Sequence, residues 1–379
     1  MNSGSNAKRF VIIGAGPAGL TADYQILREI PCAKVDVYEA EERSGGISTT
    51  IEYNGNRIDI GGHRFFSKSG TVNDFWRTLM PLQGTNAKDD ILLGRKKELS
   101  SGGPDPETGD AVMLIRDRVS RIFYRSKFFD YPISLKAQTF LNMGLFNTIR
   151  AGFSFLYSLF KKRKEDSLED FYINRFGRCL YSMFFEDYTE KVWGVHPSRL
   201  SPSWGAQRVK ELSIGTIIKE ALLKFFNPRH KTNQTSLIER FYYPKMGPGQ
   251  LWEIAAKKIV EAGGIIHYNS KVSAIRIEDS GVKEITVTCA DGARTMPCDF
   301  LLSTMPVKNL VEAVNSSGGE KAPEHITRAA HDLPYRDFIT VGLLLKRLNY
   351  ETGQESKHCK TLSSIVGSTY KNRMCVSAD

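Results

Sequence analysis

The stretch "FVIIGAGPAGL", residues 10–20, decides the fold that we expect for this chain. Its first part, Phe10–Ile13, is a short apolar run of the kind that forms a strand buried on both faces. The run leads directly into the glycine-rich hexapeptide of residues 14–19, and a helical pattern follows. A G-x-G-x-x-G sequence between a strand and a helix predicts a turn that binds a dinucleotide.

Each glycine of the hexapeptide has its own expected task. Gly14 permits the tight turn, Gly16 lets a diphosphate approach the backbone, and Gly19 lets the helix pack closely on the strand. Pro17 and Ala18 open the helix, whose N-terminus offers free amides and the positive end of its dipole to the phosphates.

An acidic residue stands where such a site needs one. The second apolar run, "KVDVYEA" (residues 34–40), ends at Glu39 and Ala40. Glu39 lies 20 residues after Gly19, and a carboxylate at that spacing accepts hydrogen bonds from ribose hydroxyls. We therefore expect Glu39 and Ala40 to line the same dinucleotide site as the glycine turn.

A second glycine pair follows in "EAEERSGGISTT", residues 39–50. Its arrangement of Glu39, Arg43, Gly45 and Gly46 resembles the flavoprotein superfamily of flavin amine oxidases, protoporphyrinogen oxidases and UDP-galactopyranose mutases. The resemblance implies that FAD is the cofactor and that the second glycine pair lies along its pyrophosphate and ribityl chain. An ordinary glycine hairpin turn is the alternative interpretation of this pair.

The resemblance implies an α/β fold with a Rossmann-type, glutathione-reductase-like FAD-binding domain, into which a helical and β-sheet substrate domain is inserted. We expect residues 1–80 and 239–312 to form the FAD-binding domain and residues 81–238 the substrate domain. Residues 313–379 should add a sheet segment to the substrate domain. The hairpin of residues 268–292 is expected to set Val272 beside the adenine end of FAD, and a strand near residues 298–306 should return to the nucleotide domain.

Relatives in this superfamily continue beyond the point that matches residue 379, so we expect the chain to be C-terminally truncated, with an aberrant tail at residues 367–379. A frameshift near Val366 would explain the loss of strand character there. A natural short form with a disordered tail is the alternative.

The segment "DIGGHRFFSK", residues 59–68, resembles the part of the mutases that lies over the flavin ring. The resemblance implies that Gly61 and Gly62 let the backbone pass against the ring. It also implies that His63 sits near flavin N5, where an imidazole can act as an acid or base near neutral pH. A plain glycine turn is the alternative.

The middle of the chain contains "YTEKVWG" (residues 188–194) and "RLSPSWGAQRVK" (residues 199–210), which resemble the central segment of the mutases. The resemblance implies that the substrate, such as a nucleotide sugar, contacts four side chains: Tyr188, Lys191, Trp193 and Arg208. The second arginine of the mutase pattern is replaced by Leu212. Nearer the start of this region, residues 96–110 are typical of an exposed loop and residues 121–133 of a β-hairpin.

Composition excludes several classes of protein. The 379 residues, 41% hydrophobic and 25% charged, are ordinary for a globular protein of two or three domains. The net charge of +10 favours an anionic partner, but the chain lacks the arginine-rich or aromatic signatures of nucleic-acid binding, so we expect no nucleic-acid partner. The six cysteines form no C-x-x-C pair, so we expect neither a disulfide framework nor a metal site.

An aromatic segment, residues 140–164, leaves two interpretations open. It is apolar over most of its length and ends in Lys161-Lys162-Arg163-Lys164. Asn147 and Arg150 interrupt it, which argues against a transmembrane span. It is either a buried helix of a helical domain or a helix on a membrane surface. The polar N-terminus lacks an apolar signal region, so a cytoplasmic protein, with or without peripheral membrane contact, is expected.

The sequence leaves three possible functions open. The chain resembles an oxidoreductase that passes a hydride from a small-molecule substrate to flavin N5, with the cofactor supplying the chemistry. It also resembles a redox-neutral mutase in which reduced flavin N5 acts as the nucleophile. A non-catalytic remnant of such an enzyme is the third.

Overall fold

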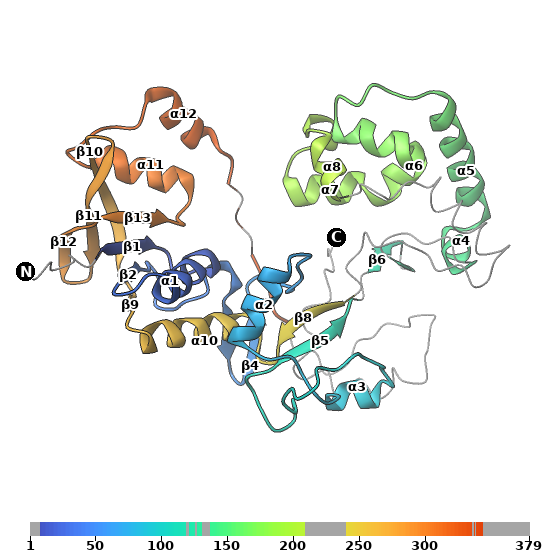
Figure 1. Ribbon diagram of the computed structural model, residues 1–379. Coiled ribbons are helices and arrows are strands. Elements are labelled where there is room, and N and C mark those ends of the chain that lie inside the picture. The colour runs from blue at the N-terminus through green and yellow to red at the C-terminus, as the bar shows by residue number, and fades with distance from the viewer. Residues whose placement is uncertain are drawn as a thin grey trace, which may run out of the picture. The chain divides into compact units, whose positions relative to one another are not determined.

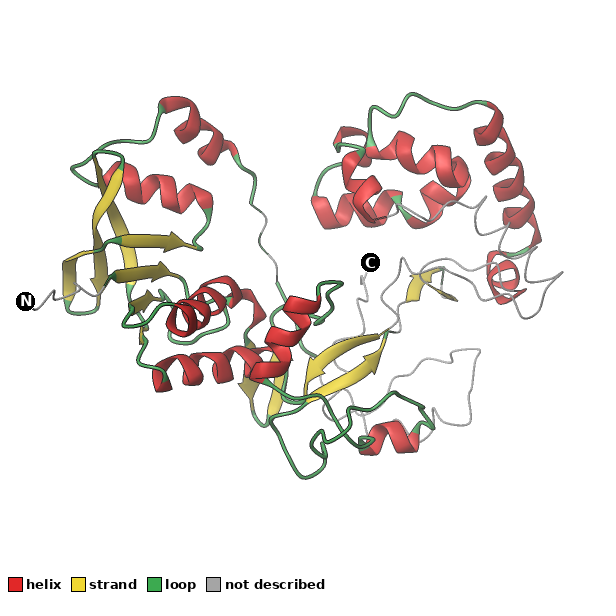
Figure 2. Cartoon of the chain, in the orientation of Figure 1, coloured by secondary structure: helices red, strands yellow, loops and turns green. Residues whose placement is uncertain are grey.

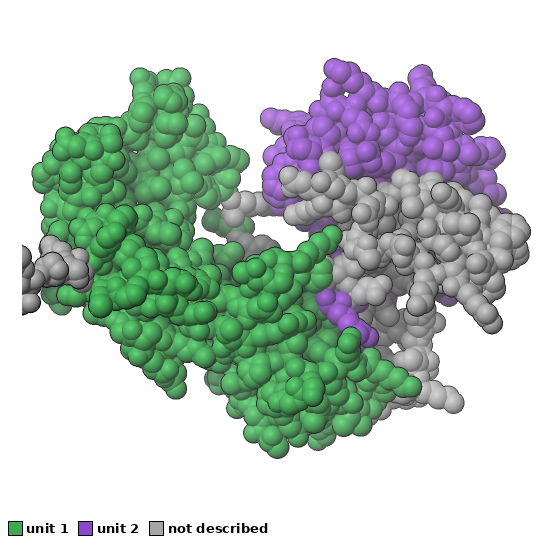
Figure 3. Space-filling model, viewed as in Figure 1, with its two compact units in different colours: residues 1–116, 241–347, 360–372 green, residues 117–240, 348–359, 373–379 purple. Residues whose placement is uncertain are grey.

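The computed structural model describes residues 8–118, 121–125, 127–130, 137–208, 240–335, 337 and 339–343. These residues belong to two compact units, coloured separately in Figure 3. Within the described residues, the first unit holds residues 8–116 and 241–343, and the second holds residues 117–208 and Arg240.

The first unit is built on a four-stranded sheet with the order β13-β1-β2-β9 (Figure 1). All three strand pairings that the sheet contains are parallel. The expected parallel α/β fold and the returning strand near residue 300 are therefore confirmed. The strands are β1 (Arg9–Ile13), β2 (Lys34–Tyr38), β9 (Ile265–His267) and β13 (Phe300–Ser303).

A separate core covers each face of this sheet, which explains why β1 is apolar without interruption from Phe10 to Ile13. On one face Ile12 packs with α1 (Pro17–Glu29) and α10 (Pro248–Glu261). On the other face Val11 and Ile13 pack with α11 (Val307–Ser316) and an antiparallel three-stranded sheet. That sheet contains the predicted hairpin and one further strand: β10 (Lys271–Glu278), β11 (Gly281–Cys289) and β12 (Gly292–Pro297).

Shorter elements surround this framework. They are η1 (Gly46–Ser48), β3 (Thr50–Tyr53), β4 (Asn56–Asp59), α2 (Gly70–Leu79), α3 (Lys88–Leu92), β5 (Met113–Asp117), β8 (Arg240–Pro244) and α12 (Glu324–Asp332).

The first unit extends further along the chain than the sequence boundaries at residues 80 and 312 suggested. It runs to Arg116 because β5 pairs with β8, and the Lys245 amide donates to the Val112 carbonyl at 3.0 Å. α11 ends at Ser316, beyond the expected boundary, because it packs on β10. Residues 313–343 contain α12 and no strand among those described, and the later part of the expected sheet segment lies outside the described residues.

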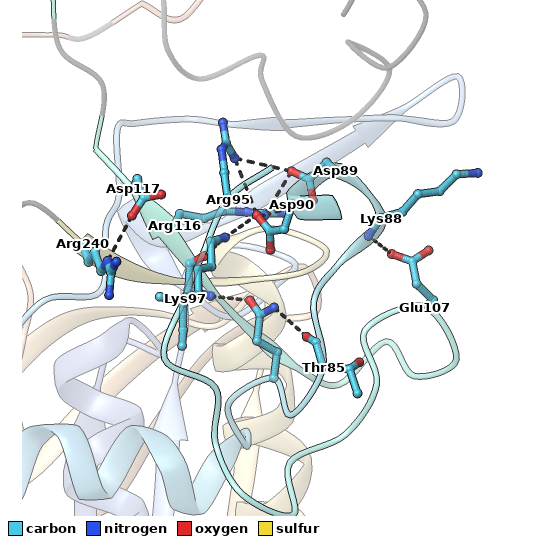
Figure 4. A network of polar contacts seen from close by, with 12 residues as sticks. Thr85, Lys88, Asp89, Asp90, Arg95, Lys97, Glu107, Arg116, Asp117 and Arg240 are labelled. Carbon is cyan, nitrogen blue, oxygen red and sulfur yellow. Dashed lines mark hydrogen bonds and ion pairs between the residues drawn. The ribbon is translucent and has the colours of Figure 1, made fainter. Parts of the chain in front are cut away.

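A buried cluster of charges holds the segment between α3 and β5 (Figure 4). The side chains of Asp90 and Lys97 are fully buried and form an ion pair. Arg116 donates to Asp90 at 3.3 Å and to Asp89 at 3.1 Å, and Arg95 lies 3.7 Å from Asp90. Burial lowers the pKa of Lys97, while its hydrogen bond to Asp90 opposes that shift. The expectation of an exposed loop at residues 96–110 is therefore wrong at Lys97, whose charge is buried because it is paired.

The second unit is mainly helical (Figure 2). It contains the predicted hairpin, formed by β6 (Arg121–Tyr124) and β7 (Lys127–Asp130). Its helices are α4 (Ala137–Met143), α5 (Leu145–Phe160), α6 (Leu168–Phe184), α7 (Glu186–Trp193), the short η2 (Pro197–Arg199) and α8 (Ser203–Arg208). Among the described helices, none combines the length and apolarity that crossing a membrane requires.

One buried acid predicts that the stability of the protein depends on pH. Asp23 on α1 is fully buried, and neither carboxylate oxygen has a hydrogen-bond partner among the described residues. Burial, assisted by the nearby charge of Asp36, raises the pKa of Asp23 from 3.8 to about 7. The folded state therefore binds the proton of the Asp23 carboxyl more tightly than the unfolded state does. The stability that this protonated carboxyl contributes is complete below about pH 4 and is lost as the pH rises through about 7.

We expect Asp23→Asn to gain stability over the wild type by about 3–4 kcal/mol as the pH rises from about 4 to about 8. Urea unfolding at both pH values measures the difference. Asp279→Asn, which changes a 93% exposed carboxylate, serves as the control. A constant difference between Asp23→Asn and the wild type at the two pH values would contradict this account.

Candidate dinucleotide-binding site

The turn after β1 needs glycine at two positions for reasons internal to the protein. Gly14 has a φ of +100°, and a Cβ there would lie 2.3 Å from the Thr304 hydroxyl oxygen. A Cβ on Gly19 would lie 1.9 Å from the Gly14 carbonyl oxygen. Gly14 therefore permits the turn and Gly19 permits close packing of α1 on β1, as the sequence predicted.

Gly16 differs from both because no contact with a described residue requires a glycine there. Its φ of −78° and ψ of −179° suit any residue. A Cβ at Gly16 would meet only the Gly46 Cα, at an ordinary contact distance of 3.8 Å. Gly16 caps the N-terminus of α1, Pro17 begins the helix and Ala18 is exposed. The bare backbone therefore faces a space at the positive end of the α1 dipole.

Glu39, at the end of β2, is fixed beside this turn. Its carboxylate accepts hydrogen bonds from the amides of Ala15 at 2.7 Å and Glu41 at 2.9 Å, one on each oxygen. A carboxylate oxygen accepts more than one hydrogen bond, so both oxygens can still accept from ribose hydroxyls. Ala40, the next residue, is exposed.

The second glycine pair docks directly on the first turn. The Gly45 amide donates to the Ala15 carbonyl at 2.9 Å. Gly45 and Gly46 have φ values of +108° and +52°, and a Cβ on Gly46 would lie 3.2 Å from the Gly16 Cα. Two motifs thirty residues apart thus form one glycine-lined surface. Arg43 is not drawn into it by any contact in the described residues: it is exposed and forms an ion pair with Glu42.

The Gly61-Gly62-His63 segment reaches the same region. His63 Nε2 hydrogen-bonds the Ile47 carbonyl in η1, next to the second glycine pair. A carbonyl only accepts, so Nε2 carries the proton and Nδ1 keeps its lone pair in the neutral ring. Gly61 packs against the His63 ring, since a Cβ there would lie 2.9 Å from Nε2. Gly62 is exposed.

This segment is anchored by residues to which the sequence pattern gave no role. Asp59, which is buried, accepts hydrogen bonds from Thr50 Oγ1 at 2.9 Å and from the Tyr243 hydroxyl. Thr50 Oγ1 in turn accepts from the Gly249 amide at 3.0 Å, at the start of α10. An acid two residues before a glycine pair was the available signal, but its partners lie up to 184 residues away.

Thr304 is the other unassigned residue. Its hydroxyl donates to the Ile13 carbonyl at 2.8 Å and closes over Gly14. Val272 has a buried side chain in the core that contains Val11 and Ile13, so any contact with adenine must come from its backbone.

The four predicted substrate residues lie on two helices of the second unit. Tyr188, Lys191 and Trp193 are on α7, and Arg208 ends α8. The ring of Trp193 lies 4.5 Å from that of Trp204 on α8. The side chain of Arg208, and Leu212 with it, lies outside the described residues.

A family model for flavin-containing amine oxidoreductases matches residues 17–377. The chain belongs to this family. Across 61% of its length it is 24% identical to a mitochondrial protoporphyrinogen oxidase from Nicotiana tabacum. The structural match to a reduced UDP-galactopyranose mutase covers 87% of this chain, with a TM-score of 0.60 and 22% sequence identity. The match to the PF1083 protein from Pyrococcus furiosus covers 86% of this chain, with a TM-score of 0.50 and 16% sequence identity.

The two solved structures support the fold of this flavoprotein and do not identify its substrate. The chain spans 42% of the tobacco enzyme and 62% and 66% of the two solved chains.

Family membership makes the cofactor FAD, and the site fits it. The Gly16–Gly46 surface leaves backbone open to a diphosphate, and each Glu39 oxygen retains capacity for a ribose hydroxyl. These are the features that a bound dinucleotide uses.

Proposed function

We propose that this flavoprotein is an oxidoreductase that accepts a hydride from a small-molecule substrate. The docking of the second glycine pair on the first turn carries the proposal, because it builds a continuous surface for the diphosphate of FAD. Membership of an amine oxidoreductase family supports the reaction class.

The residues of the first unit bind and orient the cofactor in this proposal. Gly16 and the α1 N-terminus hold the diphosphate, Glu39 holds the ribose, and Gly45 and Gly46 line the adjoining chain. Bound FAD supplies a hydride acceptor at N5. His63, fixed through Nε2 by Ile47, presents Nδ1 as the atom that can take up a proton.

We assign substrate binding to Tyr188, Lys191, Trp193 and Arg208 of the second unit. The Trp193–Trp204 pair favours a substrate with a planar group, because aromatic rings stack on such faces. A nucleotide sugar satisfies this description, so a redox-neutral UDP-sugar mutase is the second candidate function. A cytoplasmic location fits both.

Anaerobic titration of the FAD-loaded protein separates the two functions. An oxidoreductase substrate bleaches the visible band of oxidised flavin, and protoporphyrinogen IX and a panel of amines are the first compounds to test. UDP-galactose should leave that band unchanged. If UDP-galactose instead perturbs only the dithionite-reduced protein and is converted to the furanose form, the oxidoreductase proposal is wrong and the mutase is correct.

A further inference from the structure

Helix α5 packs on the rest of the second unit through a narrow stripe of its surface. Its buried residues are Ala151, Phe155 and Ser158, which lie three to four positions apart and therefore share one helical face. That face packs on α6. At Gly177, which has a φ of +76°, a Cβ would lie 2.8 Å from the Phe155 amide nitrogen, so the two helices approach closely.

The opposite face of α5 is apolar and exposed. At 100° per residue, one arc of the helix directly away from α6 contains seven large apolar residues and no charge. Phe146, Phe153 and Phe160 are exposed by 77%, 70% and 89%. Arg150 lies at the edge of the arc. We call this set the outer face: Leu145, Phe146, Ile149, Phe153, Leu156, Tyr157 and Phe160.

A helix that faces water normally presents charged and polar residues on its outer side. The outer face reverses that pattern, and Phe140 and Leu141 on the preceding helix α4 are also exposed. A contiguous apolar surface of this kind marks an interaction site. The buried-helix interpretation of this segment therefore holds for one stripe of α5 only.

The charges at the end of α5 indicate the partner. Four consecutive cations, Lys161–Lys164, follow Phe160 directly, and all four are exposed. The Lys162 ammonium donates to a carbonyl of α6 and Arg163 pairs with an acid of α6, whereas Lys164 forms only an exposed pair with Asp166. The Lys161 ammonium lies 5.8 Å from the centre of the Tyr157 ring, so its stem runs along the apolar face while its charge stays outside. Apolar aromatic rings bordered by cations match the boundary between acyl chains and anionic headgroups.

We propose that the outer face of α5 docks the protein on the surface of an anionic lipid bilayer. The sixteen residues of α5 span about 24 Å and lie in the plane of the surface, with the three phenylalanines in the acyl boundary and Lys161 and the 86% exposed Lys164 at the headgroups. This inference is independent of the proposed reaction, because it rests on α5 alone and not on the FAD site.

Vesicle co-sedimentation of the FAD-loaded full chain tests the proposal. The wild type should bind vesicles of phosphatidylcholine with phosphatidylserine and bind pure phosphatidylcholine at least tenfold more weakly. The double variant Phe146→Glu/Phe153→Glu should lower the partition coefficient at least a hundredfold. Ile91→Glu, which changes a 68% exposed residue of α3 in the first unit, is the matched control and should bind as the wild type does.

Thermal unfolding and FAD content of each variant distinguish the possible occupants. Unchanged values with lost vesicle binding support the bilayer. The proposal is overturned if the wild type does not bind anionic vesicles. It is also overturned if the double variant binds them as strongly as the wild type does. A dimer in light scattering that the double variant abolishes would assign the outer face to a second copy. A large fall in melting temperature without vesicle binding would assign it to another part of the chain.

Discussion

Gly16→Val is expected to give a folded protein that no longer retains FAD. The backbone of Gly16 has an extended conformation open to any residue, and the nearest atom to a new Cβ is the Gly46 Cα at 3.8 Å. The protein therefore tolerates the side chain, but the methyl groups occupy the space in which a diphosphate meets the turn. We expect the Kd for FAD to rise at least a hundredfold, about 3 kcal/mol.

Fluorescence titration with FAD and thermal unfolding of the apoprotein measure the two halves of this prediction. Gly318→Val is the control for a surface glycine, since a Cβ there meets nothing within 4 Å. Gly19→Val is the opposite control, because its side chain collides with the Gly14 carbonyl and should destabilise the fold itself. Full FAD content in Gly16→Val would show that the glycine surface does not hold the cofactor.

Asp90→Ala is expected to destabilise the first unit by about 3–5 kcal/mol. The change removes the acid that Arg95, Lys97 and Arg116 share, and the side chain of Lys97 is fully buried. A buried cation without its partner carries the full cost of removal from water.

Lys97→Met should cost less than Asp90→Ala, because it leaves two cations opposite two acids in the cluster. Glu52→Ala removes the partner of Arg57 in an exposed pair and should change stability by about 1 kcal/mol or less. Urea unfolding of the four proteins gives the order. Equal losses for Asp90→Ala and Glu52→Ala would mean that the cluster contributes nothing beyond a surface pair.

The sequence predicted those parts of the fold that depend on local pattern. The apolar run at Phe10–Ile13, the glycine turn and the two hairpins each carry their signal within a few residues, and all are present. The spacing of Glu39 also placed it correctly beside the turn, because parallel neighbouring strands end at the same edge of a sheet.

Features that depend on distant partners were beyond prediction. Lys97 lies in a polar stretch, and its burial depends on hydrogen bonds to Asp90 and to the Ile115 carbonyl. Asp59 depends on Tyr243 from the far side of the insertion. The apolar pattern of α5 gave no indication of which side faces inward, since the inward stripe contains the small residues Ala151 and Ser158.

The FAD content of the purified full chain tests the central claim most directly. The absorption spectrum of the native protein, with flavin released by denaturation and quantified, gives the ratio of cofactor to chain. The glycine surface and Glu39 predict a yellow protein that contains FAD in near-equimolar amount or takes it up on incubation. A colourless, folded protein that does not take up added FAD would contradict the account.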